Sequence, residues 1–331
     1  MLKVLKNLKE SWLSVIAIVL LLIVQAAGDL TLPDYTSKIV NIGIQSGGIE
    51  NPAPEVIRKS EMDNLLIFTE DDEQILNDYK EISKENLDEK EYEKLVKKYS
   101  ALENETLYEV KKLNSEEQTQ LNNMMTKPLM MLSSLENEET ANSMKEQMLS
   151  SMPANMPEQQ KIAMQNMELI DIIKQMPKEQ IDKMLETVNE KLVNMQNSIL
   201  EQAAIQQVKK EYKAIGIDTD NLQNKYIIIA GLKMLGISFI IMASAISIMC
   251  LSARVAAKLA KTLREKTFKK VLKFSNKEFS EYSTASLITR STNDIQQIQG
   301  LIAILFRVLV YAPIIGIGGF LRVLNQSDNS M

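Results

Sequence analysis

Four methionines spaced four residues apart are the first side chains in this sequence whose type and spacing could do chemistry. They are Met144, Met148, Met152 and Met156. Soft thioethers bind Cu(I), so copper handling is one interpretation. The chain has no His, however, and its single Cys, Cys250, lies in a distant apolar stretch. The pattern therefore favours an apolar stripe in which Met fills irregular packing space, and an adaptable surface for a ligand or partner stays open as a third interpretation.

The motifs of nucleotide and acid–base chemistry are missing. A phosphate loop has the form G-x-x-x-x-G-K-[ST], and none of the eleven Gly residues is followed by Lys. The absence of His removes the usual catalytic base and the commonest metal ligand. We expect no catalytic residue, metal site or cofactor in this sequence, and whether the protein is an enzyme stays undecided here.

Two ionisable residues stand within or next to apolar stretches. Asp29 follows the first such stretch, and Arg307 interrupts the third after Phe306. Ionisable groups at membrane depth are costly unless they face protein or a wet cavity, so both are candidates to line a cavity. The alternatives are an interfacial carboxylate for Asp29 and, for Arg307, a side chain that extends toward the headgroups.

Three apolar stretches would position these residues in a bilayer. Residues 11–28 carry no charge, residues 234–253 carry none either, and a third stretch lies within 285–324. About 20 helical residues cross the ~30 Å hydrocarbon core. Helical periodicity continues past Ala253 to Phe274 without Gly or Pro, so the second helix should extend well beyond the membrane. The expected fold class is an all-α membrane protein.

Charge is distributed unevenly and predicts the orientation. Residues 254–299 contain ten Lys and Arg against four Asp and Glu, whereas residues 50–222 contain 35 acidic against 20 basic residues. The positive-inside rule then places the amino terminus and 254–299 in the cytoplasm and 50–222 outside. The outer segment holds fourteen of the nineteen Met residues, and Met, Leu and Ile recur at three- and four-residue spacing over 136–211. We expect a helical extracellular domain there.

A helix turn is predicted at the cytoplasmic tip. Ser275 followed by Glu278 has the form of a capping box, and Ser283 or Thr284 could begin the next helix. Two long helices joined by a short crosspiece suit the transfer of mechanical force better than the making of a pocket.

The tip resembles the first intracellular loop of ATP-binding cassette (ABC) exporters. The residues that carry the resemblance are Arg264-Glu265, Phe279, Ser283-Thr284, Leu287-Ile288-Thr289-Arg290 and Asn293-Asp294; Ala285 stands where Gly is commoner in the family. The stretch from Leu32 to Ile44 is similar to the outer end of the family's first transmembrane helix. The resemblance covers about 1–45 and 225–325.

In this family the crosspiece is a coupling helix that docks into a groove on a nucleotide-binding domain. The resemblance implies this role for residues 276–284, with Phe279 and Tyr282 inserted and Lys277, Glu278 and Glu281 at the rim. Arg290 and Asp294 would brace the helix hairpin by pairing. The expected coupling residues are Asn276, Lys277, Glu278, Phe279, Ser280, Glu281, Tyr282, Ser283 and Thr284.

The resemblance also implies an organisation for the whole chain. The expected parts are an interfacial elbow helix (1–10), the first transmembrane helix (11–49), the acidic extracellular insertion (50–222), the second helix with its cytoplasmic extension (223–275), the coupling helix (276–284), the third helix (285–324) and a truncated outer loop (325–331). The family has six such helices, so this chain is expected to be an amino-terminal fragment of an exporter subunit.

The expected partners are the bilayer of a bacterial plasma membrane, nucleotide-binding domains carrying ATP and Mg²⁺, and a second subunit, identical or different. Nucleic acid is not an expected partner. Drugs, lipids and peptides all stay open as cargo. Two rival hypotheses also stay open. One is a membrane-anchored extracellular binding or sensor module. The other is a secreted protein whose first 26 residues form a signal peptide cleaved after Val24-Gln25-Ala26.

Overall fold

The computed structural model describes residues 11–69, 72–151, 167–192, 196–275, 277–278 and 282–328. The chain divides into two compact units. We call Met1–Lys38 with Ile229–Met331 the membrane unit, and Ile39–Ile228 the acidic unit. The predicted elbow helix at 1–10, together with Met152 and Met156, lies outside the described residues.

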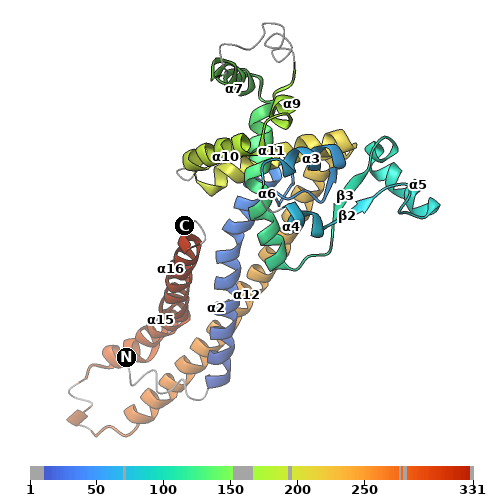
Figure 1. Cartoon of the computed structure of the whole chain (residues 1–331). Helices are drawn as coiled ribbons and strands as arrows, with labels where there is room; N and C mark the ends of the chain where they lie inside the picture. Colours follow the sequence, from blue (N-terminus) through green and yellow to red (C-terminus); the bar gives the residue numbers. More distant parts are fainter. Residues whose placement is uncertain are drawn as a thin grey trace. The chain divides into compact units, whose positions relative to one another are not determined.

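Three helical runs in the described part of the chain are long and apolar enough to cross a membrane. They span Trp12–Gln45, Thr219–Val271 and Thr284–Leu324 (Figure 1). The first comprises α2 (Trp12–Lys38) and a π-helical end, η2 (Ile39–Gln45). Many of their large apolar side chains are exposed, such as Phe239, Ile246 and Leu309. The predicted all-α membrane architecture is confirmed.

The second helix, α12 (Thr219–Val271), is 53 residues long and unbroken. At 1.5 Å per residue it extends roughly 80 Å, far more than the ~30 Å of a hydrocarbon core. No Gly or Pro occurs between Ile237 and Val271, so nothing in the sequence interrupts the backbone ladder there. The predicted continuation past Ala253 is therefore confirmed.

The third helical run is built from short α segments separated by π turns. In order these are α14 (Thr284–Thr289), η4 (Arg290–Asp294), α15 (Ile295–Phe306), η5 (Arg307–Tyr311) and α16 (Ala312–Asp328). Pro313 is the second residue of α16, just after η5, and lacks the backbone N–H that an α-helical ladder would use. A π turn is one way a helix absorbs such a local mismatch.

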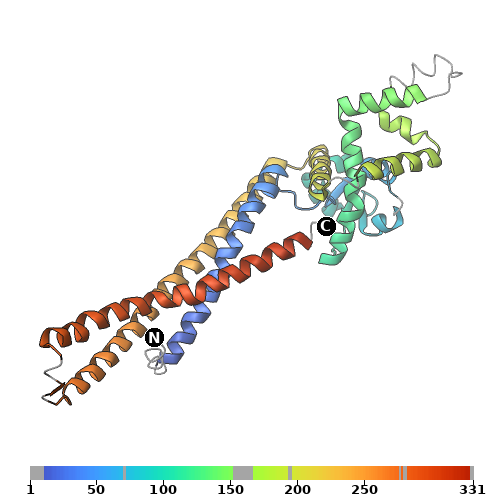
Figure 2. The same ribbon diagram turned by 90° about the vertical axis from the view of Figure 1, so that its left-hand side faces the viewer.

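The core of the membrane unit lies where the three long helices meet. It contains Ile18 and Leu22 of α2, Val255 and Leu259 of α12, and Phe306 of α15, all buried. Figure 2 shows α2 running beside α12. At Gly28 the two helices approach so closely that an added Cβ would lie 2.6 Å from Ile241 Cγ1.

The acidic unit contains a small antiparallel sheet that the helical prediction missed. Its strands are β1 (Val56–Arg58), β2 (Tyr79–Ile82) and β3 (Leu107–Val110), in the order β1-β3-β2. Tyr108 pairs with Ile57 on one side and with Glu81 on the other. Strands of three or four residues show too little alternation to stand out among charged neighbours. The expected helical segment is thus corrected to a largely helical unit with a three-stranded sheet.

Helices make up the rest of the described acidic unit. The unit extends beyond the predicted 50–222 at both ends because Gly43 and Gly48 pack against the first turns of α12. Its remaining elements are α3 (Lys59–Leu66), α4 (Asp72–Asn77), α5 (Glu89–Lys98), η3 (Ser100–Glu103), α6 (Ser115–Glu136), α7 (Glu138–Ser151), α9 (Leu169–Lys174), α10 (Lys178–Leu192) and α11 (Asn197–Ile215).

The core of the acidic unit is organised by α6 and α11, which cross and pack against each other (Figure 1). Met62 and Met125 are fully buried within it, and Met144, the member of the four-residue stripe whose side chain is described, packs against its edge. Tyr79 Oη donates to Met125 Sδ at 3.2 Å. These positions fit the packing role proposed for Met, because a flexible thioether fills irregular space.

Candidate functional site

The tip between α12 and α14 begins with the predicted capping box. Ser275 N donates to Glu278 Oε2 at 2.7 Å, and Glu278 N donates to Ser275 Oγ at 3.4 Å. The two side chains thus satisfy each other's backbone donors, as at a helix start. The hydrogen bond from the Ser275 backbone lowers the pKa of the Glu278 carboxyl. Lys277 and Glu278 are both exposed.

Two aromatic residues, one on each side of the tip, stack on each other. The rings of Phe274 and Tyr282 stack with their centroids 5.9 Å apart and their planes at 23°. The Arg290 guanidinium lies 5.5 Å from the Tyr282 ring centroid. A cation over an aromatic face is attracted by the ring quadrupole, so Arg290 ties the third helix to the tip. Tyr282 remains 38% exposed, so part of its side chain is still accessible.

The third helix starts where the sequence predicted. Ser283 is the N-cap of α14, and its Oγ accepts from Ser286 N at 3.2 Å. Thr284 is the first helical residue. Arg290 and Asp294 lie at the two ends of η4, and no ion pair joins them among the described side chains. Asn276, Phe279, Ser280 and Glu281 lie outside the described residues, so their predicted docking role stays a prediction.

Two polar links join α2 to the third helix within the membrane unit. Tyr311 Oη donates to Asp29 Oδ2, and Arg322 Nη2 pairs with Asp34 Oδ2 at 2.5 Å. Asp29 thus faces protein, which is the condition for a tolerated carboxylate at membrane depth. The side chain of Arg307 lies outside the described residues. Sequence reasoning missed Asp34, Tyr311 and Arg322, although an Arg in an apolar helix is itself a signal for a carboxylate partner.

Comparison with known proteins relates part of this chain to a known family. A model of the ABC transporter transmembrane region matches residues 178–328, which run from α10 through the tip to α16. Residues 178–328 are thus similar to the ABC transporter transmembrane region. The match therefore takes in α12, the tip and the third helical run, together with the last two helices of the acidic unit.

Curated proteins whose names describe them as ABC transporter proteins are similar to this chain over a shorter stretch. An uncharacterized ABC transporter ATP-binding protein of Mycobacterium tuberculosis, Rv1273c, is 35% identical over 96 residues, or 29% of this chain and 16% of the relative. YfiB of Bacillus subtilis, another uncharacterized ABC transporter ATP-binding protein, is 30% identical over 95 residues, or 29% of this chain and 17% of the relative. The match thus spans about a sixth of these relatives. No solved structure matches the chain.

Proposed function

We propose that this chain forms part of the transmembrane domain of an ATP-driven ABC exporter and receives force from a nucleotide-binding domain through the tip between α12 and α14. The observation that carries the proposal is the tip itself. A helix of 53 residues ends in a capped turn, and Tyr282 is held between Phe274 and Arg290. A stiff helix with a fixed end transmits displacement, whereas a flexible loop would absorb it.

The nucleotide-binding domain would supply the chemistry of ATP and Mg²⁺. The tip would supply contact area, with Phe279 as the proposed aromatic anchor and Lys277 and Glu278 as its polar rim, because aromatic anchors dominate interface energies. The membrane helices would form the translocation pathway with a second subunit. In this arrangement the acidic unit is extracellular and the amino terminus is cytoplasmic.

The test is the coupling of ATP hydrolysis to transport in the complete transporter. Phe279→Ala should leave ATP hydrolysis present while transport per ATP falls by about tenfold or more, since deleting a hot-spot anchor costs about 2 kcal/mol or more. Phe268→Ala is the matched control, because Phe268 is 63% exposed on α12 and lies eleven residues before Phe279. Normal coupling in Phe279→Ala would contradict the proposed contact.

A second candidate function is a membrane-anchored binding or sensor module, and the acidic unit's own core of buried residues favours it. The two candidates differ in what ATP does. In an exporter, cargo accumulates on one side of a sealed vesicle only when ATP is hydrolysed. In an anchored sensor the acidic unit binds its ligand while no ATP-dependent transport occurs in the complete protein.

A further inference from the structure

A cavity in the acidic unit is built like a small-molecule site. It has a volume of about 640 Å³, which is in the range typical of ligand pockets. Strand β1 and helices α3, α6, α7 and α9 contribute to its lining. The apolar lining consists of Leu132, Leu135, Ala141, Met167, Leu169 and Ile170. A ligand seated here would bury an apolar body against these side chains.

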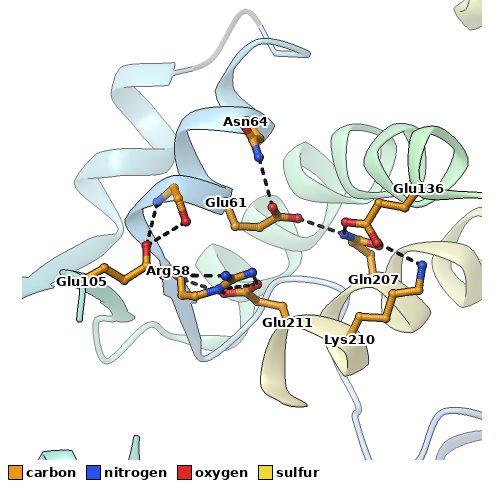
Figure 3. A network of polar contacts seen from close by, with 9 residues as sticks. Arg58, Glu61, Asn64, Glu105, Glu136, Gln207, Lys210 and Glu211 are labelled. Atoms are coloured by element: carbon orange, nitrogen blue, oxygen red, sulfur yellow. Dashed lines mark hydrogen bonds and ion pairs between the residues drawn. The ribbon is translucent and has the colours of Figure 1, made fainter. Parts of the chain in front are cut away.

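Polar side chains converge on the other side of the cavity. Figure 3 shows Glu61 between Asn64 and the Arg58–Glu211 pair, with Gln207 reaching across toward Glu136. Gln207 Nε2 donates to Glu61 Oε1 at 2.9 Å and to Glu136 Oε1 at 2.7 Å. One amide nitrogen thus links two carboxylates that both line the cavity.

The charged donors around the cavity are already engaged. Arg58 holds Glu211 through Nε at 3.0 Å and Nη2 at 2.7 Å, and its charge is thereby matched. Lys145 Nζ donates to the Met167 carbonyl at 2.6 Å. Lys210 Nζ donates to Glu136 Oε2 at 3.0 Å. Each of these cations thus already has a protein acceptor, and the Arg58 charge is balanced by Glu211.

Hydrogen-bond acceptors lie on the polar side of the cavity. Asn64 Nδ2 donates to Glu61 Oε2 at 3.3 Å, whereas Asn64 Oδ1 is buried without a partner among the described residues. This oxygen has almost no accessible surface, so the acceptors that a ligand in the cavity can reach are the carboxylates of Glu61 and Glu136. Glu61 is only 6% exposed, and burial raises the pKa of its carboxyl. A cation placed beside Glu61 would stabilise the ionised form.

We propose that this cavity binds an organic ammonium: a primary amine, carried on a compact apolar body, whose N–H groups face Glu61 and Glu136. The apolar body would occupy the side formed by α6, α7 and α9. The inference goes beyond the proposed function and does not depend on it, because it concerns the acidic unit alone. Residues 50–222 contain 35 acidic and 20 basic residues, and this negative net charge would raise the local concentration of such cations.

The experiment is calorimetric titration of the full chain in phosphatidylcholine nanodiscs with benzylammonium. Benzyl alcohol and benzoate are the matched neutral and anionic probes, and nanodiscs without protein provide the blank. Saturable binding of benzylammonium alone is the expected result. Equal binding of benzyl alcohol, or no saturable binding of either benzylammonium or the aliphatic butylammonium, would overturn the proposal.

Three variants test where the ammonium binds. Glu61→Gln and Glu136→Gln should each weaken benzylammonium binding by about tenfold or more, a loss of about 1.4 kcal/mol. Glu201→Gln is the control, because it removes the same charge from an exposed position on α11 and should change the dissociation constant by less than about twofold. Hydrogen exchange of the buried amides checks that each variant is folded. Wild-type affinity in both Glu61→Gln and Glu136→Gln would also overturn the proposal.

Discussion

Glu61 is a carboxyl group that the fold removes from water. Burial is the largest cause of its raised pKa, and the nearby charge of Glu211 adds to it. The hydrogen bond from Gln207 acts in the opposite direction, and so does the one from Asn64. Ionisation of Glu61 therefore costs folding free energy, and the hydrogen bonds from Gln207 and Asn64 reduce this cost.

Stability of the acidic unit should consequently fall as Glu61 ionises. Its pKa in the folded protein lies above the ordinary value of 4.5, so the folded state binds this proton more tightly than the unfolded chain does. The stability that protonated Glu61 contributes to the folded state is fully present below pH 4.5. It is lost as pH rises through the pKa of Glu61 in the folded protein. Glu61→Gln should therefore stabilise α3 at neutral pH and flatten the pH dependence. Hydrogen exchange of the α3 amides measures both effects, with Glu201→Gln as the control; an unchanged profile would contradict the prediction.

Arg58 and Glu211 form the most buried ion pair in the described part of the acidic unit. The Glu211 side chain is 2% exposed, and Arg58 binds it through both its backbone N, at 2.8 Å, and its guanidinium. Arg58→Met would leave a buried carboxylate with the backbone donor alone. Breaking a buried pair by removing one partner costs about 3–5 kcal/mol.

The double variant Arg58→Met with Glu211→Gln separates charge from packing. Its Gln oxygen can still accept from the backbone N of residue 58, and no charge is buried, so most of the loss should be recovered. Local free energies of opening, from hydrogen exchange of the β1 and α11 amides, give the comparison. A double variant as unstable as Arg58→Met alone would show that the aliphatic contacts of Arg58, rather than the ion pair, matter.

At the scale of elements, the close approach of α2 and α12 depends on Gly28. An added Cβ would lie 2.6 Å from Ile241 Cγ1 and 2.9 Å from its Cδ1, and a branched side chain has few rotamers with which to withdraw. Gly28→Ala should destabilise the membrane unit by about 1–3 kcal/mol, the usual cost of overpacking.

Gly236→Ala is the matched control for Gly28→Ala. A Cβ at Gly236 would meet nothing within 4 Å, and Ala is the better helix former by about 1 kcal/mol. Thermal unfolding in detergent, followed by circular dichroism, should therefore show a lower midpoint for Gly28→Ala and an equal or higher one for Gly236→Ala. Equal midpoints for Gly28→Ala and the wild type would mean that the two helices can separate without cost.

The elements that could be predicted from sequence are those that local signals determine. The lengths of the apolar stretches predicted the three membrane helices. Capping residues predicted the tip at Ser275 and the start of α14 at Ser283. The sheet was missed because its strands are short and its pairing joins distant residues, such as Ile57 with Tyr108. The Arg58–Glu211 pair and the Asp29–Tyr311 bond join residues 153 and 282 positions apart, and no local pattern signals them.

At the scale of the whole molecule, the uneven charge of the chain sets the predicted orientation in the membrane. Ten basic against four acidic residues in 254–299 favour the cytoplasmic side, and the acidic unit would then lie outside. The chain's single Cys makes this testable by labelling. After Cys250→Ser, one new Cys is introduced either by Glu93→Cys on α5 or by Lys277→Cys at the tip, where both native side chains are exposed.

A membrane-impermeant maleimide should label Glu93→Cys in intact cells and Lys277→Cys only after the membrane is permeabilised. The Cys250→Ser chain without a new Cys is the control and should not react. Labelling of Lys277→Cys in intact cells would place the tip outside the cell, where no ATP-driven partner could reach it. That result would contradict the coupling proposal and leave the ammonium site untouched, because the cavity belongs to the acidic unit on either side of the membrane.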